Sequence, residues 1–253
     1  MEEEFTSISF ASLTIPALLD NEYQNPFFRP LGYFLQRQTI LNGQIAVLNQ
    51  STLNNAIEMG NGIYDETGSI VITKYEISYS KPENLERLKS QIYLMSLSLS
   101  VENFETYIKQ VIREILEIIF SKNSAFEDFA ATHKTNRERI KFLRKYSQAI
   151  DKLFSIAIVE NYCDVYLLCE QVRHITIHSD HVVKEKDKAV LTQPSFKKYF
   201  STNSDIMGER IILEAGNADD LIDNISSLAY IIFKGICQEH SYPIKTANLR
   251  PFK

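Results

Sequence analysis

One short segment in the second half of the chain gathers side chains that could carry out acid–base chemistry. It reads Arg173-His174-Ile175-Thr176-Ile177-His178, and His181 follows shortly after it. Three of the five histidines of the protein thus fall within eight residues. Histidine can accept or donate a proton near neutral pH, and the guanidinium of arginine is suited to binding an oxyanion. The segment is therefore the first candidate for a functional site.

A helical wheel places this segment on the outside of a long helix. The apolar spacing predicts a helix over about residues 156–183. At about 100° per residue, one arc of this helix is apolar and is expected to face the core; it holds Val165, Leu168, Val172, Ile175 and Val182. The opposite arc is polar and titratable, and it holds Glu170, Arg173, His174, His178 and His181. We therefore expect the candidate residues to face water or a partner.

Two other interpretations of these residues compete with a catalytic one. Glu170 lies three residues before Arg173 and four before His174, so ordinary pairing along a solvated helix would explain all three. The three histidines, at i, i+4 and i+7, could instead share a divalent metal ion. A catalytic zinc helix of the HExxH type would need glutamate directly after the first histidine, and Ile175 stands there. We therefore expect no metal site and no cofactor.

A second candidate feature is a basic run before this helix. Residues 134–145 hold six basic side chains and one acid, Glu138; the basic residues are Lys134, Arg137, Arg139, Lys141, Arg144 and Lys145. Such a run can be a solvated helix face, or it can hold a phosphate backbone. The net charge of −5 over the whole chain argues against a broad surface that coats nucleic acid.

The composition is that of a soluble globular protein, with 44% apolar and 23% charged residues. Cys163, Cys169 and Cys237 form no CxxC pair, so we expect reduced and buried thiols. The acidic start of the chain is unlike a signal peptide, and no apolar run reaches about 18 residues. These features predict a cytoplasmic protein without a membrane span.

The character of the chain changes near residue 81. Before it, the sequence is rich in Asn, Ser and Thr, with strand-like stretches at 69–79 and, more weakly, at 6–15, and a helical stretch at 31–57. After it, apolar residues recur at helical spacing. We therefore divide the chain into an N-terminal α+β appendage of unknown role, residues 1–81, and a helical domain, residues 82–253.

The helical domain is predicted to consist of long helices. Pro82 suits the first turn of the first helix, whose apolar stripe runs from Phe104 to Ile119. Further helices are predicted at 137–153, at 156–183 and from about residue 217, with a short strand at 210–214. Long helices with short connections favour a mainly α fold, an antiparallel bundle of four to five helices.

These features together resemble the HEPN superfamily (higher eukaryotes and prokaryotes nucleotide-binding). The segment Arg173-His174-x-x-x-His178 is similar to the Arg-x4–6-His motif that the family carries on a late helix of its bundle. The segment Ser100…Glu105-Thr106-Tyr107 resembles the Ser…Glu-x-Tyr pattern of the first long helix in the family, and Ser179-Asp180-His181 resembles its Asn-rich exit. The resemblance covers about residues 82–239. It departs at His174, where the family most often has asparagine.

The resemblance implies a metal-independent endoribonuclease, of the toxin or antiphage-defence type, that acts as a homodimer. RNA would be cleaved by attack of its own 2′-hydroxyl. The resemblance implies that His178 is the general acid/base, that Arg173 clamps the phosphate, that His174 has an auxiliary role and that Glu105 is a polar partner. The basic run at 134–145 then becomes a candidate RNA-holding surface.

Two points bear on this expectation. Arg173 and His178 are five residues apart, so they lie roughly 140° apart around one helix and flank a cleft better than they grip one phosphate. Two copies across a dimer axis would bring them together. HEPN-like domains also act as non-catalytic dimerisation or nucleotide-binding modules of another protein, such as a cognate antitoxin or a defence-system partner, and this alternative stays open.

Overall fold

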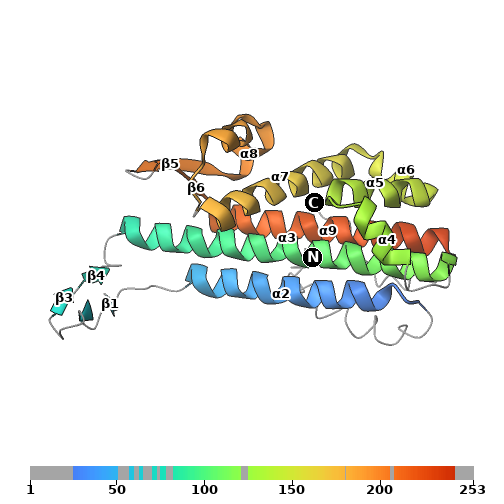
Figure 1. Ribbon diagram of the computed structural model, residues 1–253, viewed down its shortest axis with the longest axis horizontal. Helices are drawn as coiled ribbons and strands as arrows, with labels where there is room; N and C mark the ends of the chain where they lie inside the picture. Colours follow the sequence, from blue (N-terminus) through green and yellow to red (C-terminus); the bar gives the residue numbers. More distant parts are fainter. Residues whose placement is uncertain are drawn as a thin grey trace, which may run out of the picture.

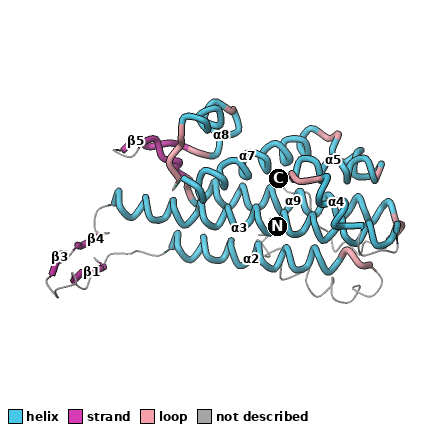
Figure 2. Tube along the Cα trace, viewed as in Figure 1, coloured by secondary structure: helices cyan, strands magenta, loops and turns pink. Residues whose placement is uncertain are grey.

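The computed structural model describes residues 25–50, 57–59, 63–64, 70–72, 75–77, 82–120, 125–179, 181–205 and 208–242. Within these ranges the protein is mainly helical, with small two-stranded antiparallel sheets (Figures 1 and 2). The longest helices are α2 (Phe28–Gln50), α3 (Pro82–Phe120), α7 (Ala157–Ser179) and α9 (Ala215–Glu239). The mainly α prediction is therefore confirmed.

Helix α3 is the element around which the other long helices pack. It begins at Pro82, as the sequence predicts, and runs for 39 residues. Its apolar stripe is buried over more than three turns, from Phe104 to Leu116. Two hydrogen bonds from side chains of α3 show the direction of α9: Ser90 Oγ accepts from Leu213 N, just before α9, and the Tyr107 hydroxyl donates to Ala229 O of α9, at 2.9 Å each. Helix α9 therefore runs parallel to α3.

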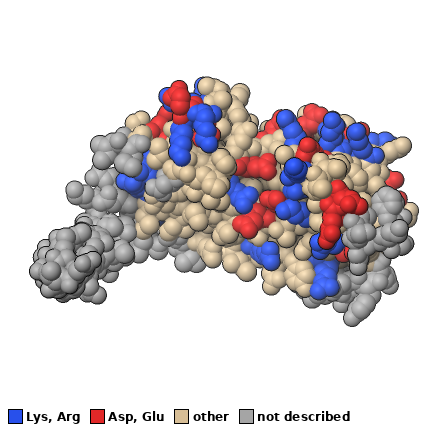
Figure 3. Space-filling model, in the orientation of Figure 1, with Lys and Arg blue, Asp and Glu red and all other residues tan. Residues whose placement is uncertain are grey.

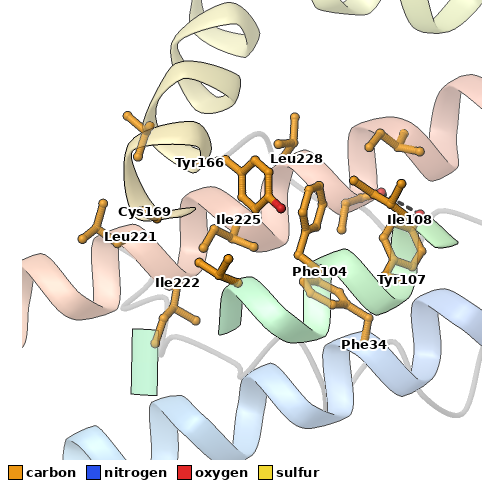
Figure 4. Close-up of a cluster of buried hydrophobic side chains, with 14 of the residues drawn as sticks. Phe34, Phe104, Tyr107, Ile108, Tyr166, Cys169, Leu221, Ile222, Ile225 and Leu228 are labelled. Carbon is orange, nitrogen blue, oxygen red and sulfur yellow. Dashed lines mark hydrogen bonds between the residues drawn. The ribbon is translucent and has the colours of Figure 1, made fainter. Parts of the chain in front are cut away.

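Helix α2 belongs to the same core, although it lies before the boundary predicted at residue 81. Phe34 lies 5.4 Å from Tyr107 of α3 between ring centroids, and Phe28 lies 5.0 Å from Phe233 of α9. Figure 4 shows Phe34 pointing from α2 towards the aromatic rings of α3. Helix α2 thus forms part of the helical core rather than an appendage, because its Phe28 and Phe34 side chains pack against α9 and α3.

The N-terminal strands are short. β1 (Ile57–Met59) pairs with β4 (Tyr75–Ile77), and β2 (Ile63–Tyr64) pairs with β3 (Ile70–Ile72), both in antiparallel register. The strand predicted at 69–79 is thus divided into β3 and β4. The strand predicted at 6–15 lies outside the described residues.

The helix predicted at 137–153 is divided in two. It follows α4 (Ala125–Thr132) as α5 (Asn136–Tyr146) and α6 (Gln148–Phe154). Ser147 separates them with an extended backbone, and its hydroxyl accepts a hydrogen bond from Ile150 N as the N-cap of α6. Thr135 and Glu138 form a capping box that fixes the start of α5. These caps decide the boundaries of α5 more than any proline or glycine does.

Helix α7 ends earlier than the sequence predicts. His181 has a φ of 64° and is 7% exposed, so it turns away from the helix axis and into the protein. The chain continues through the 3₁₀ helix η1 (Glu185–Thr192), α8 (Pro194–Tyr199), and the hairpin of β5 (Ser201–Asp205) and β6 (Gly208–Ile212). Val182 pairs with Arg210, which ties the end of α7 to this hairpin. No helix in the described ranges is long and apolar enough to cross a membrane.

We predict that Gly235→Ala lowers the stability of the fold by about 1–3 kcal/mol, because overpacking strains a filled core. A Cβ at Gly235 on α9 would lie 2.5 Å from Ile150 Cγ1 and 3.0 Å from Ile150 Cα on α6. Urea unfolding followed by circular dichroism measures the change. Gly216→Ala is the matched control, because a Cβ there meets nothing within 4 Å, and its removal of backbone freedom is expected to leave stability equal or higher. Equal stability of the two variants would contradict the close contact between α6 and α9.

Candidate active site between α3, α5 and α7

The outward face of α7 carries two exposed histidines. Val165, Leu168, Val172 and Ile175 are buried against the core, as the helical wheel predicts. His174 and His178 are exposed, and their ring centroids lie 4.6 Å apart. Their spacing of four residues places them one above the other on the helix surface. The two imidazoles therefore present donors and acceptors to whatever meets this face.

Arg173 lies between α7 and α3 rather than in free solution. Its Nη1 is 3.5 Å from Glu105 Oε2, its Nη2 is 4.0 Å from Glu102 Oε2, and the side chain is 26% exposed. Its Nε is buried and has no hydrogen-bond partner within the described part of the chain. The guanidinium is thus held by long contacts and keeps unused hydrogen-bonding capacity.

Glu105 forms ion pairs with three cations. Besides Arg173, it is 2.8 Å from Lys109 Nζ and 3.2 Å from Arg139 Nη1. Burial by itself would raise the pKa of the Glu105 carboxyl, but hydrogen bonds and charge attraction from Lys109 and Arg139 outweigh it, and the pKa is lowered. The carboxylate is therefore charged at neutral pH, and its negative charge is shared among the cations.

Arg139 is fixed in this position from α5. It donates to Asn136 Oδ1 at 2.6 Å and to Lys134 O at 3.0 Å. Asn136 in turn donates to the hydroxyl of Tyr166 at 2.7 Å and to Glu170 Oε1 at 2.8 Å. Hydrogen bonds and ion pairs thus connect α3, α5 and α7 across one buried junction, which rigidifies it.

Glu170 turns towards α5, where Asn136 is its hydrogen-bond donor. The simple pairing along α7 that the sequence allows is therefore not the main role of this side chain. Burial raises the pKa of the Glu170 carboxyl, although the hydrogen bond from Asn136 and the nearby Arg173 and Arg139 act in the opposite direction. Glu170 and Glu105 are two carboxyl groups of one network whose pKa values are shifted in opposite directions.

The structure divides the six predicted RNA-binding residues into separate groups. Arg139 is buried and pairs with Glu105, so it holds the network together. Lys134 is exposed, and its carbonyl accepts the hydrogen bond from Arg139. The other four residues line one groove between α5 and α7, namely Arg137, Lys141, Arg144 and Lys145.

Sequence reasoning missed Asn136 and Tyr166 as members of the site. Asn136 is the first residue of α5 after its Thr135 cap, where a polar side chain is ordinary. Tyr166 lies on the buried side of α7 among apolar residues. Only the crossing of α5 over α7 brings these two side chains together, so no spacing within one helix signals the contact.

His181 does not join the other two histidines, contrary to the helical-wheel prediction. It lies beyond the end of α7 and is buried, and its carbonyl accepts a hydrogen bond from Ile211 N at 3.0 Å. Across the described ranges, no group of three His, Cys, Asp or Glu side chains is arranged to hold a metal ion. Cys163, Cys169 and Cys237 are free thiols.

Comparison with known proteins gives no relative of this chain. No protein-family model matches it, and neither the curated proteins nor the solved structures contain a match.

We predict that Glu105→Gln destabilises the fold at pH 7, because Arg139 would then be a buried cation without its carboxylate, at a cost of about 1–3 kcal/mol. A carboxyl with a lowered folded-state pKa stabilises the fold above its unfolded-state pKa, and that stabilisation is lost as pH falls. The difference between wild type and variant should therefore shrink below about pH 4. Urea unfolding at pH 7 and at acidic pH measures both values.

Glu170→Gln is the matched comparison in the same network. The raised pKa of Glu170 means that its charged form is disfavoured by folding, so the amide variant is expected to be more stable than wild type at pH 7. This gain should also vanish at low pH, where the wild-type carboxyl is protonated. A shift of the same sign in both variants at pH 7 would contradict the opposite environments of the two carboxyl groups.

Proposed function

We propose that this protein is a metal-independent endoribonuclease of the HEPN type that acts as a homodimer. The observation that carries the proposal is the placement of Arg173. Arg173 lies on the helix that carries the exposed His174–His178 pair, and its guanidinium is held by a carboxylate of α3, Glu105, whose charge Lys109 and Arg139 also share. A cation held in this way can bind a phosphate without first breaking a short ion pair. In this proposal, α3, α7 and α9 belong to the HEPN bundle, and α2 packs against it.

The proposed reaction is a transesterification within the RNA. The 2′-hydroxyl gives its proton to a base and its oxygen attacks the adjacent phosphorus, while the bond from phosphorus to the 5′-oxygen breaks. An acid supplies the proton that the leaving 5′-oxygen takes up. The products are a 2′,3′-cyclic phosphate and a 5′-hydroxyl, and no oxidant, metal or cofactor is consumed.

His178 is assigned to proton transfer, and Arg173 to the phosphate. An imidazole can serve as base or acid near neutral pH. The guanidinium can donate two parallel hydrogen bonds to the phosphate oxygens, which gather negative charge in the transition state. His174, one helical turn from His178, is assigned an orienting role. Glu105 holds Arg173 and is a positioning residue.

A dimer completes the site in this proposal. Arg173 turns towards α3, whereas His178 projects from the exposed face of α7. The two side chains of one chain therefore point in different directions. Exposed apolar side chains lie beside the motif. Ile177 is 50% exposed, and Met95 and Leu99, seven and three residues before Glu102 on α3, are 49% and 46% exposed. Burying such residues between two copies would stabilise a dimer.

The charge pattern of this region supports the same arrangement. Figure 3 shows largely uncharged surface where the first half of α3 meets the end of α7, next to a cluster of mixed charge. An apolar contact surface that adjoins polar catalytic groups would exclude water from the seam. A symmetric dimer would then bring Arg173 of one copy towards His178 of the other.

We predict that the wild-type protein cleaves total RNA in excess chelator and leaves 2′,3′-cyclic phosphate ends. Arg173→Ala and His178→Ala should each lower the cleavage rate by about 100-fold or more, because each removes a group that acts on the reacting phosphate. His174→Ala should have a smaller effect. Arg87→Ala is the control, because Arg87 is an exposed arginine on the same helix as Glu105.

Two results would reject this mechanism: cleavage that survives His178→Ala, or cleavage that the chelator abolishes. If the wild type cuts no RNA but forms a dimer that binds nucleotides, the protein is instead a non-catalytic HEPN-like module that partners another protein. Mapping of product ends, gel filtration and a nucleotide titration separate these outcomes.

A further inference from the structure

A basic groove lies apart from the candidate active site, between α5 and the first half of α7. Its volume is about 530 Å³, which is in the range of ligand-binding clefts. Four cationic side chains of α5 line it, namely Arg137, Lys141, Arg144 and Lys145, and Ile140 and Leu167 contribute apolar surface. We call it the α5–α7 groove.

The groove carries a net positive charge, and most of its cationic side chains form no ion pair within the described residues. Asp151 and Asp164 are its acidic residues, and Asp151 pairs with Arg144 at 2.8 Å. No ion pair of the described residues involves Arg137, Lys141 or Lys145, and all three are exposed. Three cations are therefore available to an anionic ligand without loss of an existing ion pair.

The groove also contains a cysteine, Cys163. Burial and the neighbouring Asp164 raise the pKa of the Cys163 thiol to about 11. The thiol is therefore protonated at neutral pH and is not an activated nucleophile. The chemistry of this lining favours binding of a ligand over a covalent reaction with it.

The groove and the exposed histidines lie on one face of α7. Leu167, His174 and His178 are at i, i+7 and i+11, which returns to nearly the same side of a helix. Along the axis, the histidines follow Leu167 by about 10 Å and about 16 Å, at 1.5 Å per residue. The hydrogen bond from Asn136 to Glu170 fixes the Arg137 end of α5 one turn before His174. The Arg137 end of the groove is thus the end nearest to the candidate active site.

We propose that the α5–α7 groove holds the sugar–phosphate backbone of single-stranded RNA on one side of the bond that is cut. The inference rests on the proposed function. A stacked strand advances about 3.4 Å per nucleotide, so the distance corresponds to about three to five nucleotides from the scissile phosphate. Contacts from lysine and arginine to phosphates carry no base information, and the groove therefore binds RNA without sequence preference.

Continuity with the candidate site favours RNA over an acidic protein segment. Either ligand would neutralise the positive charge of the groove. An RNA strand that enters the active site must also pass along the α7 face between Leu167 and His174, whereas an acidic protein segment need not. The active-site motif and the groove then act on one ligand, and the groove contributes affinity rather than chemistry.

The first test is binding of a fluorescein-labelled 16-nucleotide RNA with 2′-O-methyl groups, which the proposed reaction cannot cleave. We compare wild type with the double variant Arg137→Glu/Lys141→Glu by anisotropy titration. The dissociation constant should rise by at least about tenfold, and the slope of its logarithm against log salt should fall by about 1.4, at about 0.7 per lost phosphate contact. Circular dichroism and the melting temperature verify that the variant is folded.

The matched control is Lys184→Glu/Lys186→Glu, which makes the same change in net charge at two exposed lysines, one directly before η1 and one in its first turn. Its affinity should stay within about twofold of wild type, since long-range charge effects are screened beyond about 10 Å. An equal loss of affinity in the control, or no loss in the groove variant, would overturn the assignment. So would a groove variant that keeps its RNA affinity but loses binding to polyglutamate, which would assign the groove to an acidic protein.

Cleavage assays separate this proposal from the proposed function. A dinucleotide is too short to reach the groove, so the groove variant should cleave it at the wild-type rate. A 16-nucleotide RNA should be cleaved with a KM at least about tenfold higher, and with an unchanged kcat. If the wild type binds RNA through the groove but cleaves neither substrate, the groove assignment stands and the nuclease proposal fails. If the wild type does not bind RNA at all, the groove assignment fails.

Discussion

The carboxylate of Glu105 is the interaction on which the arrangement of the site depends. It follows Phe104, which is fully buried, on α3. It pairs with one cation from each of three helices, namely Lys109 of α3, Arg139 of α5 and Arg173 of α7. A charge at a helix junction is stable only if it is paired and hydrogen-bonded, and here several partners share that task. The packing of Phe104 against Tyr166, at 4.6 Å between ring centroids, fixes the distance between α3 and α7 (Figure 4). The apolar core and the polar network therefore set each other's geometry.

The sharing of Glu105 among three cations has a functional consequence. Arg173 is fixed in direction by contacts of 3.5 and 4.0 Å, longer than those that Lys109 and Arg139 make with Glu105. A phosphate arriving at this place could therefore bind Arg173 while Glu105 stays neutralised by the other two cations. The α5 helix contributes to both parts of the molecule, because Arg139 points into the network and Arg137, Lys141 and Lys145 point out into the groove. One short helix thus stabilises the site and supplies positive surface beside it.

Periodicity within one helix predicted the buried faces of the helices and the start of α3. The buried stripe of α3, the core face of α7 and the start at Pro82 follow from spacing and from the special backbone of proline. The break at Ser147 and the early end of α7 did not follow, because a serine cap and a left-handed His181 end those helices without a proline or glycine. The network of Asn136, Arg139 and Glu105 could not be predicted from the sequence for a different reason. Glu105 lies 34 residues before Arg139, and only tertiary packing brings α5 against α3.

The central claim is that Arg173 of one protomer and His178 of its partner act on one phosphate. The most direct test is a mixed dimer, made by co-expressing Arg173→Ala and His178→Ala chains with different affinity tags and purified through both tags. One of its two sites would then keep an intact arginine and an intact histidine, so the mixed dimer should recover about half of the wild-type cleavage rate, although each parent homodimer is inactive. A mixed dimer as inactive as its parents would contradict the claim, because it would mean that both side chains of a site come from the same chain.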